Sequence, residues 1–215
     1  TTTLTGSQSL NTATGVNANW LRGSIEIKQA FAYNERNKQL RLRAFAGTYL
    51  FNSDDYFTNQ LDAWSLTWGA QDMLYDHAYL QRNADTHLLS RQFNKQQGGF
   101  KTPFLQGGSE TWIASLNGEL DLPFKLPIAL FGSVGWVPVT TITQSGKSTS
   151  TATYVEAGVG LPIVKDVFEV WFPLYVSKRI ADEETYLDRT ISDRIRFVIA
   201  LEKLDPTRML RALKP

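Results

Sequence analysis

Strict alternation of apolar and polar residues is the feature of this sequence that most constrains its fold. In QLRLRAFAGTYL, the positions from Leu40 to Leu50 are apolar or small at every second residue apart from Thr48, and Arg41 and Arg43 stand between them. Successive side chains of a β-strand point to opposite faces, so this period of two produces one oily and one charged face. The pattern predicts an all-β chain.

The alternation returns in four later segments, at residues 111–122, 155–163, 168–177 and 194–202. In the third of these, Phe172, Leu174 and Val176 fall on the apolar face, whereas Trp171 and Tyr175 fall on the other. We count eight or nine strands, each about the 9 to 11 residues that a tilted membrane strand requires. We therefore predict an antiparallel up-and-down transmembrane β-barrel, either complete or part of a larger barrel.

The connections between strands alternate in length, as they do in outer-membrane barrels. Short turns rich in Asn, Pro, Lys and Asp are predicted at residues 34–38, 123–127 and 164–167. Longer polar links are predicted roughly at residues 52–61, 81–110, 140–152 and 178–193. Residues 63–80 lose their phase, which a turn or bulge at residues 69–72 would explain.

Two units follow from this pattern. Residues 1–204 form the predicted barrel, and residues 205–215 form a short periplasmic tail helix with Asp205 as its cap and Pro206 in its first turn. If the short turns are periplasmic, nine strands would start the chain outside the cell. We therefore expect strands, or a whole region, upstream of Thr1. Residues 1–15 themselves lack the pattern of a secretory signal.

The amino-acid composition excludes several further classes of protein. The chain has no cysteine, which excludes disulfides and thiolate chemistry, and its net charge of +1 gives no field that would recruit nucleic acid. Mean hydropathy is -0.25, and no run reaches the roughly 18 to 20 apolar residues of a spanning helix. Aromatic residues make up 12% of the chain, which fits side chains gathered at a membrane interface.

Charged residues on the face opposite the apolar one are predicted to fill a narrow lumen and to pair with one another. They are Glu26, Lys28, Arg41, Arg43, Glu119, Asp121, Glu156, Glu169, Arg194, Arg196 and Glu202. The alternative is that these charges line an open pore and select the solute.

The tryptophans are predicted to anchor the barrel at the membrane interfaces rather than to line a carbohydrate groove. They are Trp20, Trp64, Trp68, Trp112, Trp136 and Trp171. The only histidines, His77 and His87, lie ten residues apart near Asp72, Asp76 and Asp85, without the spacing of a zinc site. Because nucleophile elbows and phosphate loops are also missing, we assign no catalytic, cofactor or metal residue.

Five stretches in order along the chain resemble one family. They are RLRAFAGTYLFN, LLSRQFNKQQGGFKTPF, ETWIASLNGELDLPFKLPIALFGSVG, YVEAGVGLPIVKDVFEVWFPLYVSK and DRIRFVIALEKLDP. This set is similar to the C-terminal region of large outer-membrane proteins of Gram-negative bacteria whose N-terminal part resembles aminopeptidase-N-like zinc metallopeptidases. The resemblance implies a membrane anchor for a peptidase-like domain. The peptidase motif has no matching position here, so any zinc would belong to an upstream region.

Three functions remain open at this stage. The first is a structural anchor in the outer membrane, with the lipid bilayer and lipopolysaccharide as partners, other envelope proteins attached, and no nucleic acid. The second is a channel or transporter for a solute or peptide. The third is a soluble lipocalin-like barrel, whose apolar face would point inward to a ligand.

Overall fold

The computed structural model describes residues 2–11, 16–33, 38–52, 64–67, 91–93, 95–123, 125–143, 146–164 and 167–199. The main strands are β1 (Thr2–Asn11), β2 (Val16–Ala32), β3 (Gln39–Asn52), β6 (Trp112–Asp121), β7 (Ala129–Thr143), β8 (Gly146–Val164), β9 (Phe168–Val176) and β10 (Arg196–Ile199). Two short strands, β4 (Trp64–Ser65) and β5 (Gly108–Ser109), pair with each other. The helix α1 (Lys178–Tyr186) and a 3-10 turn (Ile191–Arg194) connect β9 to β10.

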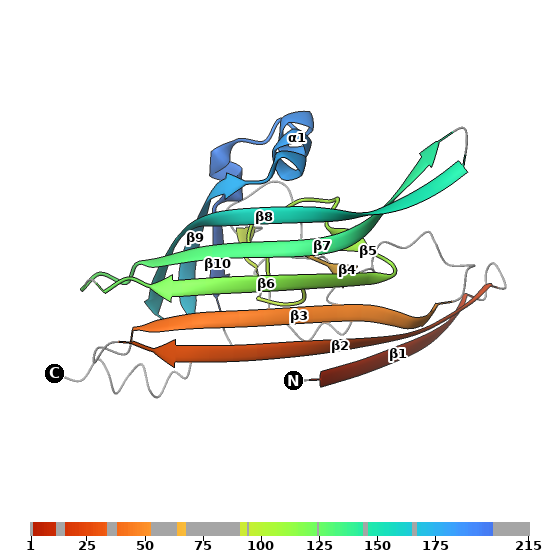
Figure 1. Ribbon diagram of the computed structural model, residues 1–215, viewed down its shortest axis with the longest axis horizontal. Helices are drawn as coiled ribbons and strands as arrows, with labels where there is room; N and C mark the ends of the chain where they lie inside the picture. The colour runs from red at the N-terminus through yellow and green to blue at the C-terminus, as the bar shows by residue number, and fades with distance from the viewer. Residues whose placement is uncertain are drawn as a thin grey trace.

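The eight main strands form one antiparallel sheet in the order β1-β2-β3-β6-β7-β8-β9-β10, so each strand pairs with the next main strand along the chain. The sheet curls at β8 to β10 into a half-barrel, with β1 and β10 as the edges of its described part (Figure 1). The predicted all-β, antiparallel, up-and-down fold is confirmed. Eight strands of this sheet lie in the described part of the chain, within the predicted count of eight or nine.

Hairpins close at all three predicted short turns. The backbone N–H of Tyr33 donates to Lys38 O at 3.0 Å, that of Leu122 to Ile128 O at 2.8 Å, and that of Val167 to Val164 O at 3.0 Å. These turns lie at one end of the sheet and the β7–β8 hairpin at the other, while α1 follows β9 and lies above β8 in the view of Figure 1. The predicted tail helix at 205–215 and the predicted phase change at 69–72 lie outside the described residues.

Burial follows the alternation with the apolar face outward. Along β6, Ser115, Asn117 and Glu119 are buried, whereas Leu116 and Leu120 are exposed. Ile27 on β2 and Leu50 on β3 are likewise exposed, at 62% and 60%. The exposed outward side chains are Ile25, Ile27, Phe31, Leu42, Leu50, Trp112, Leu116, Leu120, Leu130, Ile163, Val164 and Leu174. An apolar band therefore runs around the outer face of the sheet.

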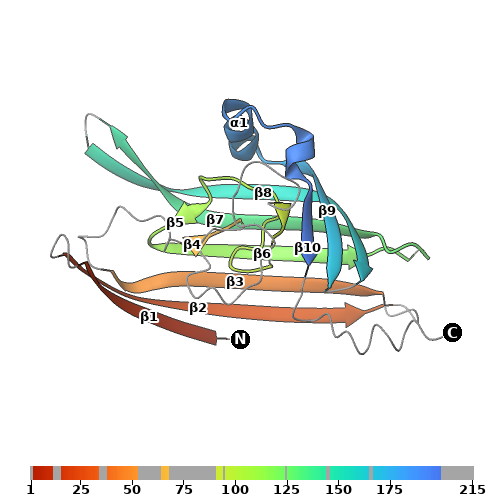
Figure 2. The ribbon, with the colours of Figure 1, turned by 180° about the vertical axis from the view of Figure 1, so that it is seen from behind.

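A compact unit covers the inner face. It consists of residues 64–67 and 95–109, which we call the plug, and it lies against β6 and β7 on the side toward which β10 curls (Figure 2). Sequence reasoning placed residues 81–110 in a polar link, and that was wrong for the plug residues Phe100 and Phe104, which are buried. The plug lacks the period-two pattern because its backbone is irregular, so the sequence did not reveal it.

Two further predicted links differ from the structure. Residues 140–152 are not a polar link, because β7 and β8 continue to the pair Thr143 and Gly146. Threonine has a high β propensity on either face, so this hairpin needs no apolar alternation. The link at 178–193 holds α1, whose Ile180 is fully buried.

A bulge corrects the predicted faces at the end of β9. Ala157 pairs with Tyr175 and Gly158 pairs with Pro173, which leaves Leu174 as an extra residue. An inserted residue reverses the alternation beyond it. Tyr175 is therefore exposed and Val176 buried, the opposite of what an unbroken period of two predicts.

None of the helices in the described part of the chain has the length and apolar character needed to cross a membrane.

Candidate functional site

The plug is held together by its own backbone. Trp64 pairs with Ser109 and Ser65 with Gly108, while the N–H of Phe100 donates to Leu66 O at 2.9 Å. The N–H of Leu66 donates in turn to Gly107 O at 2.9 Å. The two plug segments, distant in sequence, therefore form one hydrogen-bonded body.

Glycines in the sequence QQGGF allow this body to close. A Cβ on Gly98 would lie 2.2 Å from the backbone Cα of Leu66, and Gly99 adopts a φ of +73°, which is costly for other residues. Asn117 of β6 donates to Gly98 O at 3.0 Å and fixes the turn to the sheet. The two glycines thus have a structural role in the plug.

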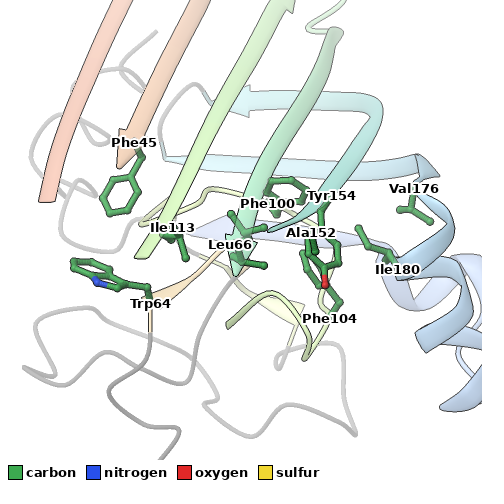
Figure 3. Packing of buried hydrophobic residues seen from close by; sticks show 11 residues of the cluster. Phe45, Trp64, Leu66, Phe100, Phe104, Ile113, Ala152, Tyr154, Val176 and Ile180 are labelled. Carbon is green, nitrogen blue, oxygen red and sulfur yellow. The ribbon is translucent and has the colours of Figure 1, made fainter. Parts of the chain in front are cut away.

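One half of the plug interface is apolar. Leu66, Phe100 and Phe104 pack with Tyr154 of β8 and Ile180 of α1, as Figure 3 shows. The rings of Phe104 and Tyr154 stack at a centroid distance of 5.0 Å. This cluster joins the plug, the sheet and the helix in a single core.

The other half of the interface is charged, and Glu119 of β6 lies at its centre. One carboxylate oxygen, Oε2, is 3.3 Å from Nη2 of Arg41 on β3 and 3.2 Å from Nζ of Lys95. The other oxygen, Oε1, is 3.2 Å from Nζ of Lys101. One carboxylate therefore joins a cation of the sheet to two cations of the plug.

Lys101 is the most buried of these cations, with a side-chain exposure of 2%. Its Nζ lies 4.3 Å from the ring centroid of Phe131 and 4.4 Å from that of Trp171. Lys95 lies 4.8 Å from Trp171 and pairs with Glu169 at 2.8 Å. Aromatic faces attract cations, so this environment compensates part of the cost of burying the ammonium groups.

Two carboxylates bind the backbone of the plug directly. Glu156 of β8 is fully buried and accepts hydrogen bonds from the N–H groups of Lys101 and Thr102, both at 2.8 Å, and from Ser133 Oγ at 3.1 Å. A carboxylate that accepts from consecutive amides makes strong, charge-assisted bonds. Glu156 therefore holds the plug on the side next to Lys101.

Glu183 of α1 repeats this arrangement at the far end of the plug. It accepts from the N–H of Leu105 at 2.6 Å and from that of Gln106 at 3.1 Å. The next residue, Glu184, binds Arg194 of the 3-10 turn through two bonds of 2.8 and 2.6 Å. The helix is thereby attached both to the plug and to the 3-10 turn that precedes β10.

Most of the predicted lumen charges lie on the inner face. Glu119, Asp121, Glu156, Glu169 and Arg196 are buried, and Glu26, Arg41 and Arg43 are partly buried. Lys28 is 64% exposed and pairs with Glu26 at 2.9 Å. Arg194 lies in the 3-10 turn rather than on the inner face of a strand, and Glu202 lies outside the described residues.

The predicted interface tryptophans separate into groups. Trp112 and Trp136 are on the outer face, where Trp112 is exposed and Trp136 partly buried. Trp64 belongs to the plug and Trp171 to the inner face, and both side chains are buried within the protein. Trp20 lies in β2, and Trp68, like His77 and His87, lies outside the described residues.

Sequence reasoning missed the cations of the plug and the carboxylates of α1. Lys95, Lys101, Glu183 and Glu184 lie in segments without alternation, where a charged residue is ordinarily solvated. The QGGF turn was the available signal, since consecutive glycines mark a close approach of backbones.

The 3-10 turn contains the titrating group with the clearest local cause. The backbone and side chain of Thr190 donate to Asp193 Oδ2, both at 2.8 Å, and these bonds lower the pKa of Asp193 below its ordinary value. Arg91, at 3.0 Å from Asp193 Oδ1, acts in the same direction. The stability that this capping box contributes is therefore present at neutral pH and is lost as pH falls through the lowered pKa.

We expect the substitution Thr190→Val to raise the pKa of Asp193 without restoring it fully, because the side-chain donor is lost while the backbone donor stays. An NMR titration of the Asp193 carboxyl measures this shift. Thr185→Val is the control, since its hydroxyl donates to Ala181 O on α1. An unchanged Asp193 midpoint in Thr190→Val would contradict the assignment.

Within the described ranges, no group of three or more histidine or acidic side chains is placed to hold a metal ion. The ion pairs and hydrogen bonds described above fix the irregular plug to the inner face of the sheet. Comparisons with protein-family models, curated proteins and solved structures give no match.

Proposed function

We propose that this chain is a transmembrane β-barrel region of the outer membrane of a Gram-negative bacterium, serving as a membrane anchor whose interior is closed by the plug. Following the resemblance of the sequence, it anchors a larger envelope protein with a peptidase-like N-terminal region. Its direct partners are then the lipid bilayer and lipopolysaccharide.

The observation that carries the proposal is the inverted distribution of polarity. Leucine and isoleucine side chains are exposed on the outer face, while Glu119, Glu156 and Glu169 are buried on the inner one. In water this arrangement is doubly unfavourable, because apolar area stays solvated and charges are desolvated. In a bilayer, lipid covers the apolar band, and all backbone polar groups of paired strands are satisfied.

The same distribution disfavours the lipocalin-like alternative. A soluble ligand-binding barrel needs an apolar inner face and a polar outer face. Along β6 the order is reversed, with Ser115, Asn117 and Glu119 inside and Leu116 and Leu120 outside.

The plug favours an anchor over an open channel. A channel requires a water-filled interior, whereas Phe100, Lys101 and Thr102 are buried against the sheet. Glu156 and Glu183 hold the plug backbone from two sides. We therefore expect low basal conductance from the unmodified protein in a planar bilayer.

Quenching by lipid tests the membrane orientation, and the absence of native cysteine makes single labels clean. A fluorophore on Leu116→Cys, on the outer face of β6, should be strongly quenched by nitroxides on lipid acyl chains. The matched control is Tyr186→Cys, the last residue of α1, which is 88% exposed and lies outside the strands of the sheet. It should be quenched weakly. Equal, weak quenching at both sites would refute the proposal and leave the soluble alternative.

A further inference from the structure

Glu119 links the sheet to the plug in a way that makes its charge decisive. Its carboxylate is within 3.3 Å of cationic nitrogens on Arg41, Lys95 and Lys101, of which the first belongs to the sheet and the others to the plug. With the carboxylate ionised, each of these cations is attracted to the same point. Without that charge, Lys95 still pairs with Glu169 and Arg41 with Asp121, but the three cations no longer share a carboxylate and repel one another.

We propose that Glu119 is an electrostatic latch that keeps the plug closed, and that the interior conducts small inorganic ions when the latch is released. This inference rests on the proposed membrane function. It adds to the anchor an ion-conducting activity that the plug holds in check.

The structure of the plug suits displacement as one body. Its two segments are hydrogen-bonded to each other through the pairs Trp64 with Ser109 and Ser65 with Gly108, and through Thr67 Oγ1, which donates to Thr102 O at 2.6 Å. These bonds remain when the unit shifts against the sheet. The contacts that must break are those to the sheet, and Glu119 makes two of the ion pairs among them.

The charged half of the inner face offers a path for ions once the plug has moved. Arg41 pairs with Asp121 at 3.0 Å and Arg43 pairs with Glu26 at 2.6 Å, so a row of both signs remains on the wall. A lining of mixed charges solvates small ions of either sign. This half of the interior, rather than the aromatic cluster, is therefore the expected route.

Single-channel recording of Glu119→Gln in a planar bilayer with potassium chloride tests the latch. The amide keeps the size of the side chain and removes its charge, and we expect the open probability to rise by at least about tenfold over the unmodified protein. Asp182→Asn is the control, because it also removes one carboxylate charge, but from an exposed ion pair with Lys178 on α1. Its open probability should stay near that of the unmodified protein.

A disulfide that ties the plug to the sheet tests whether the plug itself moves. A Cβ on Gly135 of β7 would lie 2.6 Å from a terminal carbon of Leu66, so Leu66→Cys and Gly135→Cys place two thiols side by side in a chain that has no others. In the Glu119→Gln background, oxidation should abolish the openings and reduction should restore them. Openings that persist in the oxidised protein would overturn the proposal.

A second variant covers the case in which Glu119→Gln does not fold. Lys95→Gln leaves Glu119 with Arg41 and Lys101, so we expect a smaller rise in open probability from a folded protein. If the variants fold and the Leu116→Cys label is quenched by lipid, but conductance stays at the basal level, the latch is wrong and the membrane proposal stands. If the Leu116→Cys label is not quenched by lipid, both the membrane proposal and the latch are refuted.

Discussion

The substitution Leu116→Arg is expected to destabilise the protein in a phospholipid bilayer by about 2–4 kcal/mol, as arginine does at the midplane of outer-membrane barrels. Leu116 lies in the middle of β6 and is 50% exposed on the outer face. In a bilayer this position meets acyl chains, where a guanidinium loses its hydration. Urea unfolding in phospholipid vesicles measures the difference.

Thr149→Arg is the matched control for this change. Thr149 is exposed near the tip of the β7–β8 hairpin, opposite Thr140, and lies beyond the apolar band. A charge at this position should change the free energy of unfolding by no more than about 0.5 kcal/mol, the usual range for a surface site. Equal and small effects at both positions would mean that the outer face meets water.

The substitution Glu156→Gln is expected to destabilise the protein by about 2–4 kcal/mol, because it leaves buried donors unsatisfied. The carboxylate accepts from the amides of Lys101 and Thr102 and from the hydroxyl of Ser133. An amide side chain accepts through one oxygen only, and its NH2 group faces another donor. The loss should appear in the same unfolding measurement as for Leu116→Arg.

Glu183→Gln gives the corresponding change at the other carboxylate that binds the plug backbone. Its partner amides belong to Leu105 and Gln106, which are exposed, so water can replace the lost bond. We expect a loss of about 1 kcal/mol, the net value of an ordinary hydrogen bond. A larger loss of unfolding free energy for Glu183→Gln than for Glu156→Gln would show that burial of the donor groups does not determine the effect of these substitutions.

The contrast between β6 and the plug shows which structural features an alternating sequence pattern can predict. On β6 every second residue repeats its polarity, so the strand, its length and its two faces follow from the period of two. The side of the sheet on which Glu119 lies could thus be predicted. Its partners Lys95 and Lys101 could not, because they are brought there by a segment whose conformation depends on the sheet itself.

Inserted residues in a strand also limit the prediction of which face each side chain lies on. The extra residue at Leu174 reverses the faces of Tyr175 and Val176, and no residue type marks that position as a bulge. Trp171 illustrates the same limit for aromatic residues. The alternation along β9 placed Trp171 on the polar face. Only the packing of Lys95 and Lys101 against its ring distinguishes a buried cation site from a membrane anchor.

The sequence by itself determined the class of fold, the antiparallel order of its hairpins and the polarity of each face, because side-chain direction along a strand depends on neighbouring residues alone. The tertiary structure decided what fills the inner face. Ion pairs such as Lys101 with Glu119, and backbone bonds such as those to Glu156, join residues far apart in the chain. Their energies depend on burial and distance, which exist only after the sheet has curled around the plug.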